Sequence, residues 1–570
     1  MQKEIAKLLK KAIDDLKEKV KLTEEQIESF IEIPPSAEMG DYAFPCFALA
    51  EKIELSPKDI ALQVRGNIKK IPEGFSSIET KGPYINFFVD RKKLALNLIL
   101  EILEKRDNYG KTELEKQKKI MVEFPSPNTN KPLHLGHLKN MSIGESISRI
   151  LEFSGEKVIR ANLNNDRGIH ICKSMLAYQK YGKGKKPSKE LKSDHLVGDF
   201  YVLFNNKLKN NPNLDVESHE MLRKWEAGDK EIIALAEKMN RWALDGHKET
   251  YKKFGIKHDK EYFETQIYEK GREIILDGVK KGIFKQQADS SVKINLEKEG
   301  LGEKYLLRPD GTSLYITQDL YLAKLKLEEF KLNSSIYITG NEQEYHFKVL
   351  FYLLKKLGFS FADNLYHLSY GMVNIPEGKM KSREGTVVDA DDTITKVQDL
   401  VKKELTKREK LSKKEMEKRS LIITLAAIKY LLLKTDIKKT VVFNPKESIN
   451  FEGNTGPYLL YSYARASSIL RKAKKIKKDL NVNQLEQKEI ELVKKLSEFK
   501  EIISKSFKDL NPSYIANYSY QLAQIFNEFY HTCPVIGSEK ESFRILLIEA
   551  FRQVIKTSLY LLGIEVLEKM

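Results

Sequence analysis

The stretch PSPNTNKPLHLGHLKN, residues 125–140, decides the fold that we expect for this chain. It follows KKIMVEF, a short β-like run that ends near Phe124, and it leads into a pattern that predicts a helix from about Gly136 to Phe153. The next segment, EKVIRANLNNDRG, is again typical of a strand. A strand, a helix and a second strand in this order favour a parallel sheet with helices on its faces.

His134, Gly136 and His137 lie where the loop meets the predicted helix. Open α/β sheets bind ligands at the carboxyl ends of their strands, and the free N–H groups of a helix start favour phosphate. Gly136 would let a base or ribose approach closely, and two imidazoles can donate hydrogen bonds without a permanent charge. Packing is the alternative for two histidines three residues apart. Zinc is another, but the sequence has neither HExxH spacing nor a cysteine cluster.

The segment GKMKSREGTVV, residues 378–388, places Lys379, Lys381 and Arg383 between two glycines. A basic loop of this kind suits a phosphoryl-transfer reaction, because cations can close over the charge that accumulates in the transition state. A solvated charged turn is the alternative interpretation of the segment by itself.

The flanking sequence predicts three domains. Residues 1–30 have a helical pattern, and SPKDIALQVRGNI and SIETKGPYINFFVD then predict a helix capped by Ser56 and a strand with a Gly-Pro turn. We expect a multidomain α/β protein with an α+β domain over 1–110 and a parallel-sheet domain over 111–395. The latter would carry a helical insertion at about 173–255, and a helical bundle would follow over 396–570.

The composition favours a polyanionic partner. The chain has 98 Lys and Arg against 81 Asp and Glu, a net charge of +17, and residues 401–480 alone hold 21 basic and 8 acidic side chains. Clustered positive charge suits nucleic acid, because phosphate contacts release counterions, although a generally lysine-rich surface is the alternative. No apolar run is long enough for a membrane span and the charged N-terminus does not resemble a signal peptide, so we expect a cytoplasmic protein. Cys46, Cys172 and Cys533 form no CxxC and are expected to be reduced, buried thiols.

Together, the two motifs resemble the HIGH and KMSKS signatures of class I aminoacyl-tRNA synthetases. SPNTNKPLHLGHLKN is similar to the form found in arginyl-tRNA synthetases, as are GDYAFPCFALA, RPDGTSLYITQDL and GNTGPYLLYSYAR. The resemblance covers essentially the whole chain, in the order of that family. It implies a Rossmann-like catalytic domain, an N-terminal α+β domain that contacts tRNA, and a C-terminal all-α anticodon-binding bundle.

The resemblance also implies the site residues. The catalytic residues would be His134, His137, Lys379 and Lys381. ATP would be bound by Pro127, Thr129, Lys131, His134, Gly136, His137, Lys379, Met380 and Ser382. Arginine would be bound by Glu123, Ser126, Asn128, His137, Tyr315, Asp319 and Gln343. The tRNA contacts would be Tyr458, Tyr461, Tyr463 and Arg465, and no metal ligand is implied.

The expected substrate explains two of these residues. A guanidinium is permanently charged, planar and forked, so its selective binding requires carboxylates, here Glu123 and Asp319, with Tyr315 beside them. The second lysine of KMSKS is missing, because Ser382 stands in its place, one residue after Lys381. Lys381 lies one position before that place and Arg383 one position after it. Which residue replaces the lysine stays open, and Lys131 is a candidate.

The implied reaction has two steps. The carboxylate of L-arginine attacks the α-phosphate of ATP, and the 2′-hydroxyl of the terminal adenosine of tRNA(Arg) then takes the arginyl group. His134 and His137 would stabilise the α-phosphate and ribose region, and Lys379 and Lys381, aided by Mg²⁺, would meet the pyrophosphate. Enzymes of this family commonly need tRNA even for the first step, and we expect a monomer that does the same.

Two rival functions differ from this one. A nucleotidyltransferase with the same HIGH-type site would be much shorter and would not carry a long helical C-terminal region. A non-catalytic RNA-binding paralogue would be marked by loss of the histidines or of the basic loop, and this sequence retains both.

Overall fold

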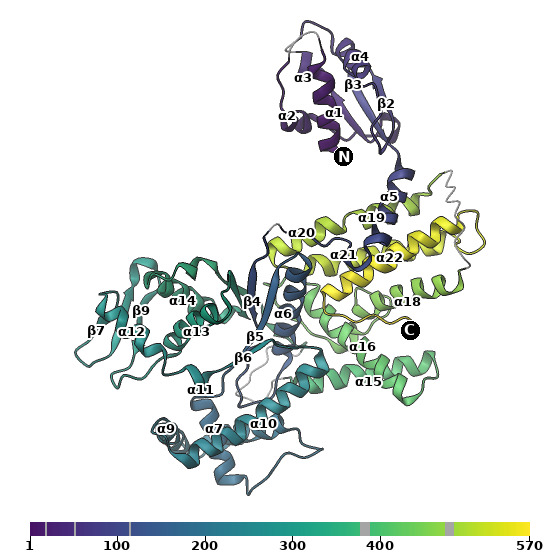
Figure 1. Cartoon of the computed structure of the whole chain (residues 1–570). Helices are drawn as coiled ribbons and strands as arrows, with labels where there is room; N and C mark the ends of the chain where they lie inside the picture. The colour runs from purple at the N-terminus through teal and green to yellow at the C-terminus, as the bar shows by residue number, and fades with distance from the viewer. Residues whose placement is uncertain (17–19, 51–52, 113, 115, 377–387, 474–483) are drawn as a thin grey trace. The chain divides into compact units, whose positions relative to one another are not determined.

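The structure, a computed structural model (Figure 1), describes residues 1–16, 20–50, 53–112, 114, 116–376, 388–473 and 484–570. The chain forms two compact units. One unit comprises Met1–Arg106, Ala473–Ser497 and Glu528–Ala550, and the other Asp107–Lys472, Glu498–Asn527 and Phe551–Met570. Each unit has its own packed core.

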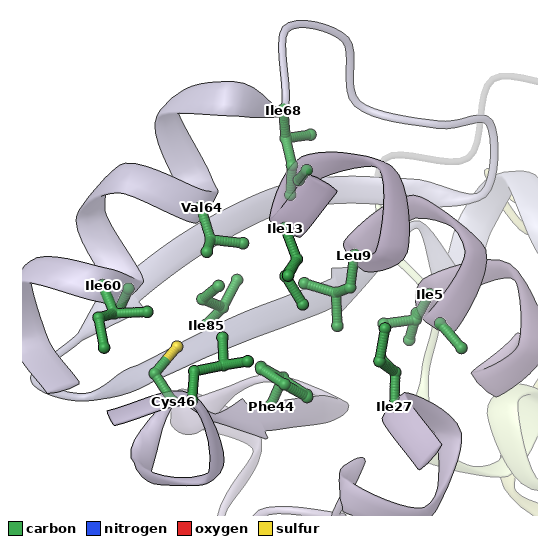
Figure 2. Packing of buried hydrophobic residues seen from close by; sticks show 14 of the residues in the cluster. Ile5, Leu9, Ile13, Ile27, Phe44, Cys46, Ile60, Val64, Ile68 and Ile85 are labelled. Carbon is green, nitrogen blue, oxygen red and sulfur yellow. The ribbon is translucent and has the colours of Figure 1, made fainter. Parts of the chain in front are cut away.

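The N-terminal region is α+β, with an antiparallel sheet in the order β1-β3-β2. Figure 2 shows Ile5, Leu9 and Ile13 on one helix face, where they pack with Phe44 and Ile85 of the strands. The elements of this region are α1 (Gln2–Asp14), α2 (Glu24–Phe30), β1 (Tyr42–Pro45), α3 (Phe47–Ala50), α4 (Pro57–Asn67), β2 (Phe75–Lys81), β3 (Tyr84–Val89) and α5 (Arg91–Lys105).

The prediction of one helix over residues 1–30 was wrong, because the structure has two helices there. Thr23 accepts a hydrogen bond from the Gln26 amide (3.3 Å), and the Gln26 side chain accepts one from the Thr23 amide (3.0 Å). This reciprocal cap starts a new helix. Other local predictions are confirmed: Ser56 caps α4, and β2 and β3 form a hairpin.

A five-stranded parallel sheet, in the order β11-β10-β4-β5-β6, forms the centre of the second unit. From β4 the chain builds outward through β5 and β6 on one side and through β10 and β11 on the other. A reversal of this kind opens a crevice outside the carboxyl ends of the two strands where it occurs, here β4 and β10. The predicted parallel sheet is therefore confirmed, and its topology identifies where a ligand would lie.

The elements around this sheet follow the predicted alternation of strands and helices. They are β4 (Lys119–Glu123), α6 (Leu135–Phe153), β5 (Lys157–Asn164), β6 (Lys260–Phe263), α11 (Glu264–Ile267), α12 (Gly271–Lys280), α13 (Tyr315–Phe330), β10 (Ser334–Gly340), α14 (Glu344–Lys356) and β11 (Leu365–Tyr370). The strand expected to end near Phe124 ends at Glu123, and the helix expected from Gly136 begins one residue earlier.

Two insertions interrupt the sheet order. The segment between β5 and β6 is helical, in agreement with the predicted insertion, and contains α7 (Ile169–Tyr181), α8 (Ser193–Leu208), α9 (Asn213–Glu226) and α10 (Lys230–Phe254). The other insertion is a small antiparallel sheet that the sequence analysis missed, formed by β7 (Lys285–Gln286), β8 (Val292–Leu296) and β9 (Gly302–Leu307).

The C-terminal part is helical apart from one short strand that pairs in parallel with β12 (Val373–Asn374). Its elements are α15 (Ala390–Arg408), α16 (Lys413–Leu433), β13 (Val441–Val442), α17 (Pro445–Ser448), α18 (Gly456–Lys472), α19 (Gln487–Ser497), α20 (Phe499–Asp509), α21 (Ser513–Thr532) and α22 (Glu541–Leu561). Within the second unit, α16 packs against both α18 and α6. None of the helices in the described part of the chain has the length and apolar character that a membrane span requires. All three cysteines are buried, free thiols, as expected.

Candidate active site

A cavity of about 690 Å³ opens at the carboxyl ends of β4 and β10. Its wall includes Glu123 at the end of β4, Gly340 at the end of β10 and Tyr370 at the end of β11. The structure brings nine of the predicted site residues to this one wall: Glu123, Ser126, Asn128, His134, Gly136, His137, Tyr315, Asp319 and Gln343. The histidine motif and the predicted arginine-binding residues, which lie up to 220 positions apart in the sequence, therefore share one cavity.

His134 and His137, hereafter the histidine pair, hold the start of α6 together. His134 Nδ1 accepts a hydrogen bond from the Gly136 amide (3.1 Å), and His137 Nδ1 accepts one from the His134 amide (3.0 Å). The two ring centroids are 3.8 Å apart. Because both Nδ1 atoms act as acceptors, the single proton of each neutral imidazole is assigned to Nε2.

The environment keeps the histidine pair uncharged. Burial, followed by the nearby Lys131 cation, lowers the pKa of His134 to about 3. Burial also lowers the pKa of His137 well below its ordinary value, with His134 and Lys131 adding to the effect. The helix entrance therefore carries two neutral rings, each with one N–H donor at Nε2.

Gly136 is required by the position of His134. A Cβ atom added at Gly136 would lie 2.9 Å from His134 Cε1 and 3.0 Å from His134 Nδ1. Any larger residue would displace the imidazole that accepts from the Gly136 amide. The glycine thus serves the histidine pair as well as the close ligand approach expected from the sequence.

The cavity wall also carries four carboxyl groups, Glu123, Glu264, Asp319 and Glu342, of which the first three are hereafter called the acid group. Glu123 forms an ion pair with Lys326, a fully buried lysine on α13 whose Nζ lies 4.6 Å from the centroid of the Tyr337 ring. The charge of Glu123 is therefore already offset by a lysine that the sequence analysis did not single out. A buried ion pair of this kind fixes geometry more than it adds stability.

Asp319 and Tyr315 both lie in the first turns of α13, four residues and about one turn apart. Asp319 Oδ2 is 2.6 Å from His346 Nε2 on α14. The Tyr315 hydroxyl approaches Gly168, where an added Cβ would be only 3.5 Å from it. One turn of helix thus presents a carboxylate and a phenol to the cavity.

Glu264 is a further cavity residue that the sequence analysis missed. It follows β6 directly, is buried, and lines the cavity. Burial, then the charges of Asp319 and Asp166, raises the pKa of Glu264 to about 8. A polar residue directly after a strand of a parallel sheet is the signal that could have identified it.

Comparison with known proteins identifies the family to which the chain belongs. Family models match residues 98–444 (tRNA synthetases class I (R), catalytic domain), 3–89 (Arginyl tRNA synthetase N terminal domain) and 459–570 (DALR anticodon binding domain). An arginine–tRNA ligase of Treponema denticola is 49% identical over 572 residues, covering 96% of each chain. One of Borrelia hermsii is 43% identical over 590 residues, covering 100% of this chain and 99% of the other.

The chain belongs to the arginyl-tRNA synthetase family.

Solved structures of arginyl-tRNA synthetases support the same fold. The enzyme of Thermus thermophilus matches with a TM-score of 0.77 at 24% identity, covering 100% of both chains. That of Plasmodium falciparum matches with a TM-score of 0.72 at 22% identity, covering 100% of this chain and 99% of the other. The predicted order of an N-terminal α+β domain, a parallel-sheet catalytic domain and a helical C-terminal domain is confirmed, whereas the boundaries at 110 and 395 stay predictions.

Three residues predicted to bind ATP in this synthetase are not part of the cavity wall: Pro127, Thr129 and Lys131. The Thr129 hydroxyl is buried and bonds to Asn240 Oδ1 of α10 (2.6 Å). The Lys131 carbonyl lies 2.9 Å from His247 Nε2, and burial lowers the pKa of the Lys131 ammonium. Thr129 and the Lys131 backbone thus fix the loop that leads to the histidine pair.

Four further predicted residues, Lys379, Met380, Lys381 and Ser382, lie outside the described residues, as does Arg383. Their assignment to the KMSKS-like segment of this synthetase rests on the sequence.

The predicted tRNA contacts all lie on α18. Arg465 donates to the Tyr461 hydroxyl (3.2 Å) and lies over the same ring, while Asn527 donates to the Tyr458 hydroxyl (2.9 Å). Tyr463 is only 3% exposed, and its hydroxyl donates to Glu568 (2.8 Å). A base cannot stack on a ring enclosed in this way, so Tyr463 fits packing within the helical bundle rather than contact with tRNA.

Proposed function

We propose that this chain is an arginine–tRNA ligase, which converts L-arginine and ATP to arginyl-adenylate and transfers the arginyl group to the 2′-hydroxyl of the terminal adenosine of tRNA(Arg). The observation that carries the proposal is the single cavity that joins the histidine pair to the acid group. A phosphate-binding helix entrance beside clustered carboxylates suits a substrate pair made of a nucleotide and a cationic amino acid.

The first step is an in-line displacement at phosphorus. The arginine carboxylate forms a bond to the α-phosphorus of ATP, and the bond to the pyrophosphate oxygen breaks. The histidine pair supports this step because its Nε2–H donors are neutral and held by backbone hydrogen bonds. Pre-organised donors stabilise developing charge without reorganisation during the reaction. No side chain is needed as a covalent nucleophile, since positioning supplies most of the rate.

Recognition of arginine is assigned to the acid group and Tyr315. Because Glu123 is paired with Lys326, we assign the guanidinium to Asp319 and Glu264, with Glu123 shaping the pocket beside them. Ser126, Asn128, His137 and Gln343 would bind the remainder of the amino acid. A site that leaves buried carboxylates unpaired in the absence of a guanidinium rejects neutral analogues strongly.

The pyrophosphate end of ATP is assigned to Lys379 and Lys381, with Met380 and Ser382 in the same segment, on the basis of sequence resemblance. Lys131 stays a candidate for the missing lysine of KMSKS. Pro127 and Thr129 would act by holding the loop, because the Thr129 hydroxyl is engaged by Asn240.

Mg²⁺ belongs to this reaction as the ion carried by ATP. Among the described residues, only Asp194, His195 and Asp391 come close enough together to resemble a metal site. That place is taken by the Lys192 ammonium, which lies 2.6 Å from Asp391 and 3.2 Å from Asp194. The cluster does not fit a divalent ion, so we assign Mg²⁺ to the substrate phosphates, where it commonly binds with few protein ligands.

The C-terminal helices would bind tRNA, with Tyr458, Tyr461 and Arg465 as candidate contacts on α18. The positive charge concentrated in residues 401–480 supports a phosphate-rich partner. A monomer and a cytoplasmic location complete the proposal, and both rest on the sequence.

Arginine-dependent exchange of labelled pyrophosphate into ATP, with and without tRNA, tests this function. We expect exchange with arginine, little with lysine, and a requirement for tRNA. Exchange driven by another amino acid would contradict the assignment to arginine, and release of a dinucleotide would instead support the nucleotidyltransferase. RNA binding without exchange under any condition would support the non-catalytic paralogue.

A further inference from the structure

A partly buried ion cluster lies behind the histidine pair, between the helical insertion and the start of α15. It consists of Lys192, Asp194, Thr250, Asp389 and Asp391, hereafter the Lys192 cluster. The Lys192 ammonium donates to Asp391 Oδ2 (2.6 Å), to the Thr250 hydroxyl (2.6 Å) and to Asp194 Oδ2 (3.2 Å). All three of its protons are used, so the ammonium is held in one place by two helices and the start of a third.

The cluster fixes the start of α15. Asp389 caps this helix by accepting from the Asp391 amide (2.8 Å) and the Asp392 amide (3.0 Å). Asp391 also receives a hydrogen bond from the Thr250 hydroxyl (3.0 Å) of α10. Burial by itself would raise the pKa of Asp391, but contacts with His195, Lys192 and Thr250 bring that pKa below its ordinary value. The carboxylate is therefore ionised and anchored.

The start of α15 in turn holds the histidine motif through the backbone. The Leu135 amide donates to the Val388 carbonyl (2.9 Å), and the Ala390 amide donates to the Leu133 carbonyl (3.0 Å). His134 and Asp389 face one another across this antiparallel bridge. A shift at the start of α15 would thus move the backbone of His134 itself.

The helical insertion supports the same loop at further points. A Cβ added at Gly198 of α8 would lie 2.5 Å from Pro132 Cδ, so α8 lies directly against the loop. On α10, Asn240 bonds to Thr129 and His247 to the Lys131 carbonyl (2.9 Å). Asn240, His247 and Thr250 share one face of α10, because they are spaced at about two and three helical turns.

We propose that the Lys192 cluster is a positioning device of the helical insertion, which sets the backbone of the histidine pair through α15 and thereby governs ATP binding and adenylate formation. Lys192 and Asp391 are positioning residues, since neither belongs to the cavity wall. The acid group belongs instead to β4, α11 and α13. Loss of the cluster therefore acts mainly on the nucleotide, because arginine keeps the whole acid group and loses at most its contact with His137. This inference rests on the proposed function of the cavity.

The test is pyrophosphate exchange by the full-length chain, with KM measured separately for ATP and for arginine. Lys192→Met leaves Asp391 and Asp194 without their cation, and we expect an ATP KM about 10-fold higher, equivalent to about 1.4 kcal/mol. Asp391→Asn keeps an acceptor oxygen for Lys192 and Thr250, so its ATP KM should rise by only about 3-fold. The arginine KM should stay within about 2-fold of wild type in both variants, because the acid group is held separately.

Lys180→Met is the matched control, because it removes a partly buried ion pair with Glu217 (2.5 Å) inside the same insertion. It should leave both KM values unchanged. If Lys192→Met does not fold, Asp391→Asn carries the test by itself, since it preserves the size of the side chain.

Three outcomes are distinguishable. Equal rises in the KM of ATP and of arginine, or a loss of folded enzyme with both KM values unchanged, would show that the cluster is merely structural and would overturn the inference. Absence of arginine-dependent exchange in the wild type would instead contradict the proposed function. A selective rise in the ATP KM supports the inference.

Discussion

The histidine pair and the acid group line one cavity, but they are built in opposite ways. His134 and His137 take their hydrogen bonds from backbone amides within three residues, and burial keeps both rings neutral. Glu123 and Asp319 instead meet side chains from other elements, Lys326 and His346, which lie 203 and 27 positions away. A locally built site is set by a short motif, whereas a site built from distant charges depends on the whole fold.

The difference matches the ligands that we assign to each group. A neutral imidazole can donate a hydrogen bond to a phosphate oxygen without forming an ion pair. A cationic substrate, in contrast, needs a pocket with net negative charge, which the clustered carboxyl groups provide. The same clustering raises the pKa of Glu264.

The largest expected effect comes from removing one charge of the acid group. Asp319→Asn should lower kcat/KM for arginine by about 10³-fold. The guanidinium would be buried without its carboxylate partner, and an unpaired buried charge costs several kcal/mol. The ATP KM should change little. Pyrophosphate exchange with each substrate varied in turn measures both. Asp277→Asn, which removes a surface pair with Lys281, is the control. A normal arginine KM in Asp319→Asn would mean that the pocket is wrongly assigned.

The next largest effect tests the histidine pair. His134→Ala removes one pre-organised donor and the acceptor of the Gly136 amide, so kcat for adenylate formation should fall by about 10²-fold. His134→Gln, whose amide nitrogen can stand near the place of Nε2, should recover part of the rate. Single-turnover kinetics would measure both. An unchanged rate in His134→Ala would exclude this ring from the reaction.

The same ring makes a prediction about pH. Because the pKa of His134 is about 3, the neutral donor persists as the pH falls from 8 to 5. The rate of adenylate formation should therefore show no loss in that range from titration of the histidine pair. A loss near pH 6.5 that disappears in His134→Gln would contradict the assigned neutral state.

A moderate effect is expected at Glu264. Its pKa of about 8 leaves it protonated at pH 7 without arginine, whereas a guanidinium favours the ionised form. Arginine binding should therefore release a proton below pH 8, and arginine affinity should rise by up to about 10-fold per pH unit up to that point. Calorimetry in two buffers of different ionisation enthalpy measures the release. Glu264→Gln should abolish it, and Glu273→Gln on α12 should not.

The smallest effect is expected at the glycine of the motif. Gly136→Ala brings a methyl group to within 2.9 Å of His134 Cε1, so the ring must leave its preferred position. A displacement of this size costs about 0.5–1.5 kcal/mol, which predicts an ATP KM about 2- to 10-fold higher. The arginine KM serves as the internal control. A change in the arginine KM alone would contradict the proposal that the histidine pair binds ATP and the acid group binds arginine.

The sequence predicted the parallel sheet and the helical insertion from local rules, and nine residues of the cavity wall from the family resemblance. Strand ends and helix starts place Glu123 and His134 at the same edge of the sheet. Glu264 was missed because β6 is only four residues long and shows little alternation. Thr129, predicted to bind ATP, does not line the cavity, and its hydroxyl bonds to Asn240, a partner 111 residues away that the sequence does not reveal.

The sequence by itself determined the α/β succession, the capped helix entrance and the side chains brought to it, because each depends on residues a few positions apart. Only the tertiary structure decided which of those side chains carry charge. Lys326 forms an ion pair with Glu123. Burial and the charges of Asp319 and Asp166 raise the pKa of Glu264, whereas burial and the nearby Lys131 keep His134 neutral. The charge of an ionisable group depends on its burial and on every charge within several ångströms, and folding draws those neighbours from across the chain.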